Sequence, residues 1–218
     1  MVNGRNAETH CRGNPSGAGA QVVTVAADIT TPKGQEALLT VDILVNNNSG
    51  PPRRDFREID RDALLAGVVG NMATPIELVR RVIDGMVERR FGRIVNITSA
   101  SVKMPLEGLD LSSGARAGLT GFLAGVARSV AHANVTINFL LPGSFDTRRL
   151  QAGQEAAAKR LGVPVETVAD QHRAKIPARR FGEAEEFGKA CAFLCSSHAG
   201  YITGQSLLID GGAYPGIL

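Results

Sequence analysis

Two serines and an arginine have the types and the spacing to form a small polar site. Ser99 ends the apolar segment GRIVNITS, and Ser112 follows 13 residues later, where a helix-like run begins. Arg116 comes four residues after Ser112, so a helix would place both on one face. A serine hydroxyl is a very weak acid, and no activating base lies near Ser112 in the sequence. Arg116 can grip a phosphate or a ribose, but it does not release a proton at neutral pH.

Alternating strands and helices must position these side chains. Continuous apolar segments, typical of strands buried on both faces of a parallel sheet, lie at 20–30, 41–47, 92–98, 134–143 and 205–212. Apolar residues at three- and four-residue spacings predict helices over 60–88 and 115–130, and a third helix over about 183–195. This alternation predicts an α/β fold with a doubly wound parallel sheet flanked by helices.

The segment 144–180 is polar and rich in alanine and arginine, and it follows a predicted strand end. It is expected to form a mobile helical flap over the carboxyl edge of the sheet, where such folds bind ligands. The chain shows no internal repeat and no linker. We therefore expect one domain over residues 1–218 that includes the flap.

The composition narrows the class of protein. The 218 residues are 44% hydrophobic and 21% charged, with a net charge of +3, and the arginine pairs are scattered. No apolar run approaches the roughly 20 residues of a membrane span, and no secretory signal is visible. Three cysteines do not suit a disulfide framework. The expectation is a cytoplasmic protein that binds neither membrane nor nucleic acid.

Several segments together resemble the signatures of the short-chain dehydrogenase/reductase superfamily. They are DILVNNNSGPP (42–52), RIVNITS (93–99), LLPGSFDT (140–147) and YITGQSLLIDGG (201–212). The resemblance runs from about Val2 to the C-terminus, and it implies a Rossmann-like fold. Within the superfamily the chain looks most like a branch of β-ketoacyl-ACP (3-oxoacyl-ACP) reductase-like proteins, whose own divergent active-site segment is similar to LSSGARAGLTG.

The resemblance also implies the catalytic residues. The superfamily uses an Asn-Ser-Tyr-Lys tetrad in which the tyrosine exchanges the proton. Asn71 and Ser99 match it, whereas Ser112 and Arg116 stand where tyrosine and lysine are found. The usual proton transfer is therefore broken, and any remaining hydride transfer is expected to be slow. Pro75, which cannot donate a hydrogen bond to the carbonyl of Asn71, predicts a helix kink near 71–75.

The cofactor implied by the resemblance is NADP(H) in preference to NAD(H). A basic residue just past the second strand of the family, here Arg5, favours the 2′-phosphate, and Asp28 resembles the acidic residue that bonds the adenine amino group. Either could equally be a surface turn residue. The other expected cofactor-binding residues are Asn46, Asn47, Asn48, Ser49, Pro142, Gly143 and Thr147.

The first βα unit of the family, with its glycine-rich loop, has no counterpart in this sequence. Gly13, Gly17 and Gly19 have a suitable spacing, but the strand–loop–helix context of a phosphate loop is missing, which favours a flexible connection. Because the first strand lies in the middle of such a sheet, the remaining strands must meet across a gap or rearrange. The hypothesis is that the sequence is an incomplete gene product.

Some other residues could carry chemistry, although a plainer interpretation is favoured for each. Lys103, Glu107 and Asp110 lie between the two serines, and His172 lies on the flap; surface charge is the default for all four. Ser99 could simply bond backbone at a strand end. Cys191, Cys195 and His198 share a helix face, but core packing of the cysteines is favoured over a metal site.

Three functional hypotheses remain open. The first is an NAD(P)-dependent oxidoreductase that reduces a carbonyl or oxidises a hydroxyl on a small or acyl-carrier-linked substrate. The second is a non-catalytic family member that acts in binding or assembly. The third is an inactive truncated product. The resemblance implies a homodimer or homotetramer through the helices at 60–88 and 111–130.

Overall fold

The computed structural model describes residues 2–4, 24–36 and 41–217. Among these residues the strands form two separate parallel sheets. β1 (Val2–Gly4) pairs with β2 (Thr24–Ala26), and β3 (Ile43–Asn46), β4 (Gly92–Ile97), β5 (Val135–Pro142) and β6 (Ser206–Ile209) follow one another in the order β3-β4-β5-β6. The predicted α/β fold with parallel strands is confirmed.

The larger sheet is built on its two central strands. Every residue of β5 from Val135 to Leu141 is buried, and β4 is buried from Gly92 to Asn96. This explains why both segments read as continuous apolar runs, because side chains on both faces of a sheet covered on both sides avoid water. The predicted strand over 20–30 is shorter than expected: β2 covers only 24–26 of the residues described there.

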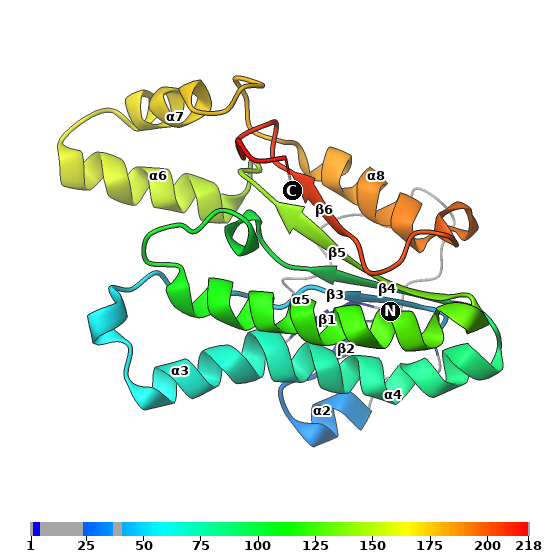
Figure 1. Cartoon of the computed structure of the whole chain (residues 1–218). Helices are drawn as coiled ribbons and strands as arrows, with labels where there is room; N and C mark the ends of the chain where they lie inside the picture. The colour runs from blue at the N-terminus through cyan, green and yellow to red at the C-terminus, as the bar shows by residue number, and fades with distance from the viewer. Residues whose placement is uncertain (1, 5–23, 37–40, 218) are drawn as a thin grey trace.

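Helices cover both faces of the larger sheet (Figure 1). On one face, α4 (Thr74–Glu88) and α5 (Asp110–Val130) pack on β4 and β5 around a core that includes Leu119, Ile94 and Phe139. On the other face, α8 (Ala184–Cys195) packs on the same strands through Leu194, Val95 and Leu140 in a smaller cluster. The short helix α2 (Pro32–Glu36) follows β2. The helix predicted from residue 115 in fact begins at Asp110.

β3 is covered on only one face. Leu44 is buried in the core against α4 and α5, but its neighbours Ile43 and Val45 are 46% and 42% exposed. Successive side chains of a strand point to opposite faces, so the exposed residues face the α8 side of the sheet, where α8 covers β4 and β5. The edge strand next to the split in the sheet therefore presents apolar side chains to solvent.

The long predicted helix over 60–88 is interrupted where a kink was expected. α3 (Arg61–Val68) passes into a π-helical turn at Val69–Ala73, labelled η3, and then into α4. At this turn the Thr74 N–H bonds to the Val69 carbonyl, and Pro75 has no N–H for the carbonyl of Asn71. Such turns place a local distortion inside a helix, often at a functional site. Here the distortion carries Asn71.

Taken together, residues 61–88 are long and apolar enough to span a membrane by length and composition alone. The core helix of a soluble protein passes the same test. In this fold Leu78, Val79, Val82 and Met86 pack in the core against the sheet. The length of this helical stretch is thus explained by its packing against β4, β5 and α5.

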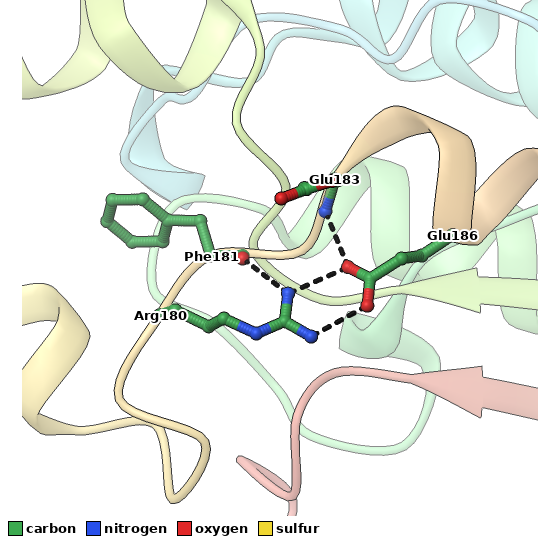
Figure 2. A network of polar contacts seen from close by, with 4 residues as sticks. All are labelled: Arg180, Phe181, Glu183 and Glu186. Carbon is green, nitrogen blue, oxygen red and sulfur yellow. Dashed lines mark hydrogen bonds and ion pairs between the residues drawn. The ribbon is translucent and has the colours of Figure 1, made fainter.

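The predicted flap is helical. It contains α6 (Arg148–Leu161) and α7 (Val165–Ala174), which lie beyond the carboxyl ends of β5 and β6 (Figure 1). Its return to the sheet is fixed by Arg180, whose two terminal nitrogens donate to Glu186 at 2.7 and 2.6 Å. Glu186 also accepts from the Glu183 N–H and so caps α8 (Figure 2). One carboxylate therefore holds both the end of the flap and the start of the next helix.

Candidate active site

A cavity of about 720 Å³ lies between the segment after β2, the loop after β3, and helices α3 and α5. Its volume is within the roughly 300–1,000 Å³ of ligand pockets. It brings together six of the residues predicted from the sequence: Asp28, Asn47, Asn48, Ser49, Asn71 and Ser112. Residues that are more than 80 positions apart in the chain thus line the same cavity.

Ser112 and Arg116 form a buried pair on α5. Arg116 Nε lies 3.2 Å from Ser112 Oγ and donates to it, which leaves the hydroxyl hydrogen of Ser112 free to donate elsewhere. Both residues are nearly covered, with 8% of Ser112 and 7% of Arg116 exposed. The arginine thus orients the serine at the cavity wall.

Arg116 also joins three segments of the fold. Nη1 donates to the Ile97 carbonyl at the end of β4 at 2.7 Å, and Nη2 donates to the Asn48 carbonyl after β3 at 2.9 Å. Burial, followed by the nearby charge of Arg149, lowers the pKa of Arg116 to about 10. The guanidinium therefore stays protonated at neutral pH. It is a fixed cation and a structural tie, and it takes no part in proton exchange.

The asparagines of the cavity present unused acceptors. Asn71 is 3% exposed, and its Nδ2 donates only long hydrogen bonds, to the Gly67 carbonyl at 3.4 Å and to Ser49 at 3.5 Å. Asn48 Nδ2 donates to the Gly70 carbonyl at 2.6 Å. The Oδ1 atoms of both asparagines are buried and have no hydrogen-bond partner. Buried acceptors without a partner indicate a place for a donor such as a hydroxyl, an amide or water.

At the β2 side of the cavity, Asp28 is ordered by its own turn. Asp28 Oδ1 accepts from the N–H of Thr30 at 3.0 Å and from its hydroxyl at 2.6 Å. Asp28 is the one acidic side chain among the described residues that line the cavity. Its carboxylate and the acceptors of Asn48 and Asn71 suit the hydroxyl and amino groups of a nucleoside. The glycines at 13, 17 and 19 and Arg5, which were considered for the phosphates, lie outside the described residues.

Ser99 has a local role in the structure. It is the N-terminal cap of the 3₁₀ turn Ala100–Val102, and its Oγ accepts from the Ser101 N–H at 3.1 Å and lies 2.9 Å from Ser101 Oγ. It does not line the cavity described above. The plainer interpretation, a strand-end serine that bonds backbone, describes these contacts. The Ser99 hydroxyl is nevertheless a hydrogen-bonding group near the end of β4.

The structure does not bring the other proton-transfer candidates to the cavity. Lys103, Glu107 and Asp110 are absent from its lining, although Gly108 and Leu109 of the same loop are present. His172 Nε2 lies 3.0 Å from Ser144 Oγ, and its ring packs edge-on against Phe181. Burial, then the charges of Lys175 and Arg53, lowers the pKa of His172. The neutral imidazole of His172 therefore dominates at neutral pH, and the hydrogen bond and the ring contact of His172 both lie near the flap.

Several expected cofactor-binding residues have other positions. Asn46 was expected at the cofactor, but it is buried and donates from Nδ2 to Asn96 Oδ1 at 2.9 Å, which ties β3 to β4. Pro142 ends β5 and Gly143 follows it, and Thr147 caps α6 by accepting from the Leu150 N–H. A Cβ on Gly143 would lie 2.5 Å from the Asp210 Cβ, so this glycine permits close packing on the β6 side. These three residues do not line the cavity.

The cysteines of α8 belong to the core. Cys191 and Cys195 are free and half-buried, and they pack against the cluster of Leu194, Val95 and Leu140. Within the described part of the chain, no three metal-ligating side chains come together. A hydrogen bond from the Cys195 thiol lowers the pKa of Cys191 to about 7. The core-packing interpretation of the pair is confirmed.

Two residues at the site were missed in the sequence. Gly50 lines the cavity, and a Cβ built on it would lie 3.4 Å from Ser112 Oγ, 3.6 Å from Arg149 Nη1 and 3.7 Å from Arg116 Nη2. From the sequence, Arg148 and Arg149 were interpreted as one of several scattered arginine pairs on the surface. The available signal for Arg149 was its position, two residues after the expected cofactor-binding Thr147 and near the start of the flap. Only tertiary structure shows that the flap brings it to the loop after β3.

Comparison with known proteins agrees with this architecture. Residues 17–214 match the family described as enoyl-(acyl carrier protein) reductase. The chain is 34% identical over 176 residues to acetoacetyl-CoA reductase of Cupriavidus necator, covering 81% of this chain and 67% of that protein. It is 33% identical over 205 residues to 3-oxoacyl-[acyl-carrier-protein] reductase FabG of Escherichia coli, covering 90% and 79%.

A solved structure gives the same assignment. YwfH, an NADPH-dependent reductase involved in bacilysin biosynthesis, superposes with a TM-score of 0.85 at 28% sequence identity, covering 92% of this chain and 80% of that one. The family match spans most of the chain, and the relatives cover most of it at more than 30% identity. The chain belongs to the short-chain dehydrogenase/reductase superfamily, a family of NAD(P)-dependent oxidoreductases.

Proposed function

We propose that the protein is an NADP(H)-dependent reductase of the 3-oxoacyl-ACP reductase type that acts on a carbonyl, or in reverse on a hydroxyl, without a tyrosine. The observation that carries the proposal is that Ser112, oriented by the buried cation Arg116, shares a cavity with Asn71 and Asp28. The substrate would be a small or acyl-carrier-linked oxo compound, by analogy with acetoacetyl-CoA reductase and FabG. The matching family is named for an enoyl reductase, whereas the two relatives are named for the reduction of an oxo group. That this protein reduces a carbonyl is therefore part of the proposal.

The residues of the chain fit the nucleoside part of such a cofactor. Asp28, Asn48 and Asn71 would accept hydrogen bonds from it, and the orphaned Oδ1 atoms of the two asparagines are the reason. When bound, the cofactor would supply or accept the hydride. The preference for NADP(H) rests on Arg5 and on the NADPH dependence of YwfH.

Ser112 and Arg116 would then polarise the substrate oxygen. The hydroxyl of Ser112 is free to donate to that oxygen because Arg116 already supplies the hydrogen bond that Ser112 accepts. Neither residue can release a proton at neutral pH, so the proton must come from water. General acid–base catalysis contributes about 100- to 10,000-fold, and turnover should fall short of that of a tyrosine-bearing relative by a factor of this order.

The test is a titration of the purified chain with NADPH and NADH by calorimetry, together with melting curves and NADPH oxidation in the presence of acetoacetyl-CoA. Saturable NADPH binding with a raised melting temperature and slow turnover is the expected result. NADPH binding should be tighter than NADH binding. A folded protein that binds neither nucleotide would overturn the proposal.

An assembly subunit is the second candidate, and exposed apolar side chains on α3, η3 and α5 favour it. Leu64 and Leu65 on α3, Val69 on η3 and Phe122 on α5 are each between 43% and 52% exposed. Paired with a second copy, this face would form the homodimer or homotetramer of the proposal. Light scattering that shows a stable oligomer, with no nucleotide binding, would favour assembly over catalysis.

The free cysteines of α8 accord with the proposed cytoplasmic location.

A further inference from the structure

Three hydrogen-bond donors converge on an empty position above Gly50. The position that a Cβ of Gly50 would take lies 3.4 Å from Ser112 Oγ, 3.6 Å from Arg149 Nη1 and 3.7 Å from Arg116 Nη2. Because residue 50 is glycine, no side chain fills this space. This position is one bond length from the Gly50 Cα, so a bound oxygen would lie further out, on the cavity side of Gly50 and among these three groups.

The donors at this position still have hydrogens to give. A guanidinium carries five N–H groups, and the hydrogen bonds of Arg116 to Ser112, Ile97 and Asn48 use three of them. Arg149 gives one N–H of Nη2 to the Pro51 carbonyl at 3.3 Å, while Nη1 faces Gly50. Ser112 keeps its own hydroxyl hydrogen, which the proposed reduction directs to the substrate carbonyl oxygen. The site therefore lacks an acceptor, not donors.

The charge at this position is also uncompensated. Arg116 and Arg149 are close enough for their repulsion to act on Arg116, and neither forms an ion pair with a carboxylate of the described residues. Arg116 is nine-tenths buried, where an unpaired charge is costly. Asp28, the acidic side chain of the cavity lining, is engaged by Thr30 in its own turn.

The charges at the start of α6 also favour a bound anion. Arg148 and Arg149 occupy its first turn, which contains no acidic residue. The partial positive charge of a helix N-terminus normally favours acidic side chains there and disfavours cations. Two cations at this end become favourable when an anion binds between the helix and the loop after β3.

We propose that Arg116 and Arg149 form a carboxylate-binding subsite beside Gly50, next to Ser112, and that the substrate is a free 2-oxo or 3-oxo acid. That the bound anion is a substrate rests on the proposed reductase function. The anion site itself does not depend on that function. Ser112 stands in the place of the proton-exchanging tyrosine. A carboxylate held by Arg116 and Arg149 beside Ser112 lies within one or two carbons of the reacting carbonyl, whereas the phosphate of a carrier thioester lies much further along its chain.

Calorimetric titration with acetoacetate tests the subsite, with methyl acetoacetate as the neutral probe and inorganic phosphate as the competing anion. Arg149→Gln removes one donor, and Gly50→Ala fills the space at ordinary contact distances. Arg148→Gln is the matched control because it removes an equal charge from the same helical turn. Acetoacetate binding should weaken about 10-fold or more in the first two variants and less than about 2-fold in the control.

Four results would overturn the subsite: undetectable acetoacetate binding, equal binding of the methyl ester, an equal loss in Arg148→Gln, or phosphate binding that depends on Arg149 and is tighter than acetoacetate binding. NADPH titration of the same proteins separates the two proposals. NADPH binding with acetoacetate affinity indifferent to Arg149 would reject only the subsite. Acetoacetate binding that depends on Arg149, in a chain that binds no nucleotide, would reject only the reductase.

Discussion

Arg116 Nε donates a hydrogen bond to Ser112 Oγ at 3.2 Å, one helical turn earlier on α5. The two residues stand where the superfamily has lysine and tyrosine, and they keep the same spacing and a cation. They lack a group that titrates near neutral pH. The site thus retains the means to orient a substrate oxygen while the chain itself holds no proton donor at that position.

Restoring the tyrosine and lysine should restore proton transfer. We expect Ser112→Tyr combined with Arg116→Lys to raise the turnover number by about 100- to 10,000-fold with whichever of acetoacetate and acetoacetyl-CoA the parent reduces, because a phenol beside a cation can act as general acid. The measurement is steady-state NADPH oxidation. Arg116→Lys alone is the control and should give no such gain. Unchanged turnover in the double variant, with NADPH affinity preserved, would mean that proton transfer is not what limits this protein.

Removing the arginine should destabilise the fold as well as the site. Arg116→Met leaves the Ile97 and Asn48 carbonyls without their donor, and each buried orphan costs roughly 1–3 kcal/mol. Urea unfolding should show a loss of this order in the free energy of unfolding. Arg149→Met, at an exposed arginine, is the comparison and should cost much less. Equal losses in the two variants would contradict the role of Arg116 as a tie between β4, the loop after β3 and α5.

The flap anchor should make stability depend on pH. Hydrogen bonding from Arg180, then the backbone N–H of Glu183, lowers the pKa of Glu186 from 4.5 to about 2. The stability that this carboxylate contributes is present above about pH 4.5 and is lost as the pH falls through about 2. Melting curves of Glu186→Gln should therefore converge on those of the parent at the acid end. Glu185→Gln is the control, since among the described residues Glu185 forms its ion pair with the exposed Lys189.

The two cysteines of α8 should differ in reactivity. Because Cys195 donates to Cys191, the pKa of the Cys191 thiol falls to about 7 and that of Cys195 rises. Alkylation by iodoacetamide, followed by peptide mass spectrometry, should label Cys191 with a midpoint at lower pH than that of Cys195. Cys195→Ala should shift that midpoint upward. A midpoint that stays in place in this variant would show that the neighbouring thiol is not its cause.

The sequence by itself determined the layout of the elements. Continuous apolar runs fixed β4 and β5, apolar spacing fixed α4 and α5, and the position of Pro75 indicated the distortion now seen as the π-helical turn. These features follow from local periodicity and from the geometry of one residue, so they can be read without long-range contacts. The helical nature of the flap was accessible for the same reason.

Only the tertiary structure decided which polar residues share the cavity. Asn46 and Asn47 are adjacent in the sequence, but a strand turns them to different surroundings, so one ties β3 to β4 and the other lines the cavity. Arg149 lies 99 residues from Gly50, and only the fold of the flap places its guanidinium beside that glycine. Side-chain direction and long-range proximity arise from packing, and a single sequence does not encode them in any local pattern.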